Sequence, residues 1–113
     1  MRLAVCAPGN TPQTCIGGNA GHGSQHRVGE AIFICYISAN NTWIRVYDQA
    51  VPGSFLLNGV ESGGTGDCVN ATLSPPTGVD TVIAEVYSVQ NTAQGPRPNA
   101  LLGRASISFY LNP

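Results

Sequence analysis

The stretch VDTVIAEVYSV at residues 79–89 decides the fold class of this chain. Residues at every second position form one apolar series, Val82, Ala84 and Val86, set against Thr81, Ile83, Glu85 and Tyr87. A period of two is typical of a β-strand with one face buried. The same alternation recurs in the runs that begin at Thr42, Cys68 and Leu101, and no window sustains a helical stripe over three turns.

Short β-rich runs separated by turns continue on both sides of this stretch. The expected strands are 2–6, 31–38, 42–49, 54–58, 68–74, 79–89 and 101–111, with loops at 59–66 and 94–99. Six or seven short strands in a chain of 113 residues predict an all-β fold, in which two antiparallel sheets pack face to face as a sandwich.

Residues 1–30 differ in composition from the rest, because they are rich in glycine and hold both histidines. We expect them to form an N-terminal arm that a disulfide ties down and that packs on the domain. Residues 27–113 are expected to form the β-sandwich itself. The chain then makes a single domain overall, in keeping with its length.

The charge content limits the classes of partner. Only 10% of residues are charged, the five cations are all arginine, and the net charge is −1. This composition argues against a nucleic-acid binder that relies on a basic face, and against a highly charged disordered chain. No apolar stretch approaches the ~20 residues of a membrane span, so membrane insertion is not expected.

Four cysteines in a short, glycine- and proline-rich chain favour a disulfide framework and an oxidising compartment. Of the three possible pairings, we favour Cys6 with Cys15 and Cys35 with Cys68; four reduced, buried thiols are the alternative. The protein is therefore expected to be secreted or exposed at the cell surface. Met1–Val5 is too short for the apolar region of a signal peptide, so we interpret the chain as a mature form.

The segment RVGEAIFICY at 27–36 resembles the opening of immunoglobulin-like modules of bacterial secreted and surface proteins, and GGTGDC at 63–68 and PPTG at 75–78 resemble their turns. The resemblance covers about residues 27–111 and implies a binding, spacer or adhesive module. Trp43 follows Cys35 too closely for an antibody-type domain, and Gly66 stands where a tyrosine is usual. We therefore expect Cys68 on an E-like strand beside the strand of Cys35.

Two groups of residues are candidates for a metal site. Cys6, Cys15, His22 and His26 supply the donor atoms that zinc prefers, but the spacing of the two cysteines is too long for a zinc knuckle. Asp48, Glu61, Asp67 and Asp80 are carboxylates near loops, yet their spacing fits no EF-hand. We expect no metal and no cofactor.

Catalysis has little support in the sequence. Ser24 and His26 lie close together, but no nucleophile elbow accompanies them. Paired carboxylates for glycoside hydrolysis sit in no known motif. We expect a protein that is not an enzyme.

Two surfaces are candidates for contact with a ligand or partner. Tyr36, Trp43, Arg45 and Tyr47 form a polar–aromatic strip if their side chains share an exposed strand face, although core packing is the favoured interpretation for Trp43. The strand residues Arg2, Leu3, Ala4 and Val5 are candidates for self-association by strand addition.

These observations predict a non-catalytic extracellular module with a structural or adhesive role, which as a self-assembling subunit would bind further copies of itself. One alternative is a carbohydrate-binding module that uses the aromatic strip on a glycan. Another is a small secreted inhibitor or effector that presents the loop at 59–67 or 90–99.

Overall fold

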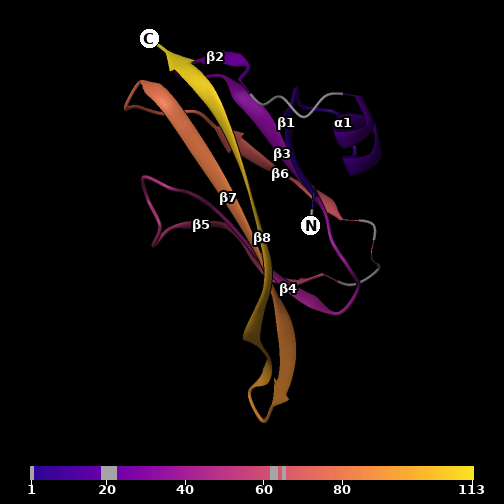
Figure 1. The fold of residues 1–113 in the computed structure, drawn as a ribbon. Helices are drawn as coiled ribbons and strands as arrows, with labels where there is room; N and C mark the ends of the chain where they lie inside the picture. Colours follow the sequence, from indigo (N-terminus) through magenta and orange to yellow (C-terminus); the bar gives the residue numbers. More distant parts are fainter. Residues whose placement is uncertain (1, 19–22, 62–63, 65) are drawn as a thin grey trace.

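The computed structural model describes residues 2–18, 23–61, 64 and 66–113. Within this part of the chain, two β-sheets and one short helix are present (Figure 1). The fold is therefore mostly β, as the alternating pattern predicts.

The smaller sheet has three antiparallel strands in the order β1-β3-β6. They are β1 (Arg2–Cys6), β3 (Ala31–Ile37) and β6 (Asp67–Thr72). Cys35 lies opposite Ala4 on β1 and opposite Cys68 on β6. The prediction that Cys68 lies on a strand beside that of Cys35 is therefore confirmed.

The larger sheet has five strands in the order β2-β8-β7-β4-β5. They are β2 (Gln25–Arg27), β8 (Gly95–Asn112), β7 (Gly78–Thr92), β4 (Thr42–Asp48) and β5 (Phe55–Glu61). All neighbours are antiparallel except β2, which runs parallel to the end of β8. The N-terminal region thus closes one edge of the sheet.

Both sheets contribute to one apolar core. Ile32 and Ile34 of β3 pack in the same cluster as Ile44, Val46 and Phe109 of the larger sheet. Ile44 and Val46 are fully buried while the residues between them are not, as expected from alternation along residues 42–49. The opposite side of the larger sheet is left to face outward.

The β7–β8 hairpin is longer than expected, because residues 94–99 were predicted to be a loop and instead lie in the hairpin. Two prolines, Pro96 and Pro98, suggested a loop. Each faces only β7 in this part of the sheet, so the missing N–H group removes no bond to a further strand. The far end of the hairpin extends away from the smaller sheet (Figure 1).

One helix, α1 (Pro12–Gly18), was not expected. Thr11 caps it, because its hydroxyl accepts a hydrogen bond from the Thr14 amide at 3.3 Å and its carbonyl accepts one from Cys15. Thr11 before Pro12 is a sequence signal for a helix start, which the glycine-rich composition obscured. Among the described residues, no helix has the length and apolar character that crossing a membrane requires.

Two described segments of the expected N-terminal arm, residues 1–30, are strands of the sheets. β1 is a full member of the smaller sheet, and β2 is paired with β8. The reason is burial: Ala4 is 0% exposed and Val5 is 4% exposed, on opposite faces of the strand.

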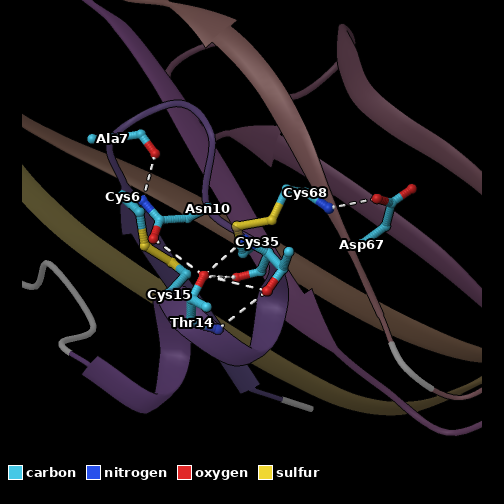
Figure 2. The surroundings of a disulfide bond; sticks show 9 residues. Cys6, Ala7, Asn10, Thr14, Cys15, Cys35, Asp67 and Cys68 are labelled. Atoms are coloured by element: carbon cyan, nitrogen blue, oxygen red, sulfur yellow. Dashed lines mark hydrogen bonds between the residues drawn. A yellow bond between two sulfur atoms is a disulfide. The ribbon is translucent and has the colours of Figure 1, made fainter.

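The two disulfides are Cys6–Cys15 and Cys35–Cys68, the pairing favoured from the sequence. Figure 2 shows them side by side where α1 covers the smaller sheet. Cys35 and Cys68 join neighbouring strands of one sheet, with Cα atoms 4.0 Å apart, whereas an antibody-type disulfide crosses between sheets. Disulfide bonds are consistent with an extracytoplasmic protein.

Candidate functional site

The outward side of the larger sheet carries the strongest candidate for a contact surface. Strand register places its side chains in three rows that cross β5, β4, β7 and β8 in that order. We call the following twelve residues the outer face: Val60, Trp43, Tyr87 and Leu101; Asn58, Arg45, Glu85 and Arg104; Phe55, Tyr47, Ile83 and Ser106.

The outer face is unusually apolar for an antiparallel sheet, whose solvent side is normally polar. Phe55 is 40% exposed, Val60 is 41% exposed and Leu101 is 55% exposed. They surround Trp43 and Tyr47, which are half-buried. Exposed apolar side chains that gather on one face in this way mark an interaction site in many soluble proteins.

Arg45 lies at the centre of the outer face. Its guanidinium carbon is 5.3 Å from the centre of the Phe55 ring and 5.1 Å from that of Tyr87. Its Nε donates a hydrogen bond to Asn58 Oδ1 at 3.1 Å, and Trp43 Nε1 donates to the same oxygen at 2.6 Å. These contacts hold the arginine in one arrangement before any partner arrives, which reduces the entropy lost on binding.

Glu85 supplies the negative charge beside Arg45 in the central row. It accepts a hydrogen bond from the Tyr87 hydroxyl at 2.8 Å and lies 3.9 Å from Arg104. Desolvation and the Glu85 carboxylate raise the pKa of Tyr87, and the Arg45 guanidinium opposes the rise. The row therefore alternates in charge, with Arg45, Glu85 and Arg104 in succession.

Three of the four predicted contact residues lie together on the outer face, whereas the fourth, Tyr36, is buried elsewhere. Trp43, Arg45 and Tyr47 share the outer face, so the favoured core position for Trp43 is wrong. Tyr36 is wrong as a ligand contact, because it is only 2% exposed. The apolar run of β3 hides which face Tyr36 occupies, since that strand is covered on both sides by the core and the disulfides.

Tyr36 instead links the two sheets. Its hydroxyl donates a hydrogen bond to Glu61 Oε2 of β5 at 2.7 Å, and both side chains are buried. Burial and the neighbouring Glu61 carboxylate raise the pKa of the Tyr36 hydroxyl. Glu61 is therefore a structural residue rather than a calcium ligand.

The other candidate metal ligands do not form the two metal sites considered from the sequence. Cys6 and Cys15 are oxidised, so their sulfur atoms are not thiolate ligands, and His22 lies outside the described residues. Asp67 accepts a hydrogen bond from the amide of Cys68. Asp48 and Asp80 do come together, because both line the same cavity between the sheets.

Self-association through Arg2–Val5 stays a prediction. β1 is at an edge of its sheet, but two of its side chains, Ala4 and Val5, are buried. A partner strand would meet only the backbone edge and the exposed Arg2.

The Ser24–His26 pair noted in the sequence extends to a third residue, Glu30, which sequence reasoning missed. Ser24 Oγ lies 2.7 Å from His26 Nε2, and His26 Nδ1 bonds Glu30 Oε2. This is the order of a hydrolase triad, but these residues line neither the cavity between the two sheets nor the one beside Ile83 and Arg104. His26 also packs edge-on against Phe109 with ring centres 5.2 Å apart, so the series fastens β2 to the end of β8.

Comparison with known proteins adds no relative. No protein-family model matches the sequence, and no curated protein or solved structure is significantly similar to it.

Proposed function

We propose that this protein is a non-catalytic, secreted or surface-exposed module that associates with a second copy of itself through the outer face. The observation that carries the proposal is the pre-ordered Arg45 on an apolar sheet face. Tryptophan, tyrosine and arginine are the residues most often found at the energetic centre of protein interfaces. Here Trp43, Tyr47, Tyr87 and Arg45 are grouped around one point.

The strand order supports an immunoglobulin-like module. In such a module β1, β3 and β6 would correspond to strands A, B and E, and β4, β5, β7 and β8 to strands C, C′, F and G, which agrees with the order of the strands in each sheet. This assignment agrees with the resemblance of residues 27–111 and with a structural or adhesive role.

The outer face is self-complementary. A two-fold axis between β4 and β7, parallel to them and lying in the interface, would place β4 of one copy over β7 of the other. Each Arg45 would then face the partner's Glu85, and each Trp43 would face the partner's Tyr87. The net charge of −1 adds little repulsion between copies.

The area of the outer face sets the affinity that we expect for the dimer. Four strands about 4.8 Å apart and three rows about 6.8 Å apart give a footprint of roughly 400 Å², about half the usual area for each partner of a stable complex. We therefore expect a weak dimer, with a dissociation constant in the micromolar range or above.

Sedimentation velocity from about 5 to about 500 μM tests the proposal, because this range spans the expected dissociation constant. Arg45→Glu would place Glu beside the partner's Glu85 and should weaken the dimer about tenfold. The exchange Arg45→Glu with Glu85→Arg should restore it. Arg97→Glu, which makes the same change in net charge on the far part of the hairpin, should have no effect. A native chain that is monomeric at every concentration would overturn the proposal.

A second candidate is carbohydrate binding by the same residues. The exposed Phe55 ring packs edge-on against Tyr47, with centres 5.8 Å apart, and Asn58 lies nearby with polar atoms for hydroxyl groups. A glycan array probed with native protein and with Trp43→Ala tests this candidate, with Tyr110→Ala as the aromatic control. Binding that survives Trp43→Ala, or no binding, argues against it.

A further inference from the structure

A cavity lies between the two sheets, on the side of the larger sheet that is opposite the outer face. It is a cavity of about 270 Å³ at the end of the core where the β4–β5 and β6–β7 connections meet, and we call it the end pocket. Ile32 and Ile34 line it from the smaller sheet, and Val82 and Phe109 line it from the larger one. Its walls are thus mainly apolar side chains of the core.

Two carboxylic acids, Asp48 and Asp80, break this apolar lining. The alternation that buries Val46 and Val82 also turns Asp48 and Asp80 to the inner side of the sheet, two positions farther along β4 and two positions earlier on β7. Asp48 also accepts a hydrogen bond from the Ala50 amide at 2.9 Å, which fixes its carboxylate at the β4–β5 turn. Inner positions in a sandwich normally hold apolar residues, so the two acids depart from the pattern that forms the core.

We propose that the end pocket binds a small primary amine in its ammonium form, with the ammonium group between Asp48 and Asp80 and a short apolar chain against Ile32, Ile34 and Phe109. Charge complementarity selects this ligand class. Two carboxylates repel a carboxylate or phosphate, and a neutral alcohol brings no charge to offset theirs. A calcium ion needs six to eight oxygen ligands, and besides the two carboxylates the side chains that line the end pocket offer only the hydroxyl groups of Ser54, Thr72 and Ser74.

A proton held between two neighbouring carboxyl groups removes their repulsion, and an ammonium group takes the place of that proton. Desolvation and the neighbouring Asp48 raise the pKa of Asp80 to about 7, while the backbone amide of Thr81 opposes the rise. Asp48 and Asp80 are the titratable side chains among the described residues that line the end pocket. Binding below about pH 7 therefore releases a proton, and affinity increases as the pH rises toward 8.

Titration calorimetry with n-hexylammonium as the probe tests the proposal. We expect a dissociation constant near 1 mM at pH 8, which is reasonable for a ligand of this size. At pH 6 we expect weaker binding with proton release, measured as a dependence of the heat on the ionisation enthalpy of the buffer. Hexanoate and 1-hexanol, which share the chain but lack the ammonium group, should bind at least tenfold more weakly.

Asp80→Asn and Asp48→Asn should each weaken n-hexylammonium binding at least tenfold at pH 8. Asp67→Asn, which removes the same charge from an exposed position beside the Cys35–Cys68 disulfide, should change it less than twofold. NMR spectra of each variant establish that it is folded. Equal binding of 1-hexanol, an equal effect of Asp67→Asn, or no binding to the native protein would overturn the proposal. None of these outcomes depends on self-association, because the outer face lies on the other side of the larger sheet.

Discussion

Single residues set the tightest constraints in this fold, and Gly66 is the clearest case. It lies just before β6 with φ at +78°, a region that side chains rarely adopt. A Cβ atom there would lie 1.8 Å from the carbonyl oxygen of Tyr36. Glycine thus lets β6 approach β3 closely enough for the Cys35–Cys68 bond to form.

Gly66→Ala should destabilise the protein by on the order of 3 kcal/mol, because it combines left-handed strain with a backbone clash. Urea denaturation monitored by tryptophan fluorescence measures the loss. Gly53→Ala is the matched control, since nothing lies within 4 Å of its added Cβ and its φ is not positive. Equal stability of the two variants would show that β6 can shift away from β3 without cost.

At the scale of elements, α1 depends on its disulfide. A helix of seven residues is too short to be stable alone, so Cys15 and its bond to Cys6 hold α1 on the smaller sheet. The Cys35–Cys68 bond, by contrast, joins strands that are already paired by hydrogen bonds. The Cys6–Cys15 disulfide therefore holds a helix in place, whereas the Cys35–Cys68 disulfide reinforces an existing pair of strands.

Replacing each cysteine pair by serine tests this difference. Loop-closure entropy predicts a loss of about 2.7 kcal/mol for Cys6–Cys15 and about 3.8 kcal/mol for Cys35–Cys68, given sequence separations of 9 and 33. We expect hydrogen exchange in residues 12–18 to become fast only in the first variant. Continued protection of α1 without its crosslink would contradict this account.

The β7–β8 hairpin should be stable in one half and mobile in the other. Residues 82–87 have β4 on one side and β8 on the other, whereas residues 90–92 and 95–97 have only each other. Hydrogen exchange should therefore be at least about tenfold faster in the far part of the hairpin. Uniform protection along β7 would show that the far part is covered, for example by another copy.

At the scale of the whole molecule, the Asp48–Asp80 pair ties stability to pH. An unfolded aspartate has a pKa of 3.8, whereas that of folded Asp80 is about 7. Between these values the folded state binds more protons, so the free energy of unfolding decreases as the pH rises. The contribution of the pair is complete below the unfolded pKa and is lost as the pH passes about 7.

Urea denaturation at intervals between about pH 5 and pH 8 measures this slope. Asp80→Asn should flatten it and should make the protein relatively more stable at pH 8. Asp67→Asn should leave the slope unchanged. A native profile without any decrease in this range would contradict a shared proton between the two acids.

The parts of this architecture that were predictable are those that depend on alternation and cysteine spacing. Residues 42–48 and 79–89 alternate clearly, so both strands followed from sequence. The buried side of residues 42–48 did not follow, because a core position was favoured for Trp43. Residues 94–99 and Tyr36 were misassigned because edge position and two-sided burial depend on neighbours that are distant in the chain. The outer face could be suspected from Trp43, Arg45 and Tyr47, but Phe55 and Tyr87 join it only through strand register.

The parallel pairing of β2 with β8 has a consequence for the order of assembly during synthesis. Gln25–Arg27 finds its partners only at residues 110–112, so the larger sheet cannot be completed before this last segment has been made. All four cysteines lie within residues 6–68, so both oxidations can precede that step. An exported nascent chain would thus carry both disulfides while β2 still lacks its partner strand.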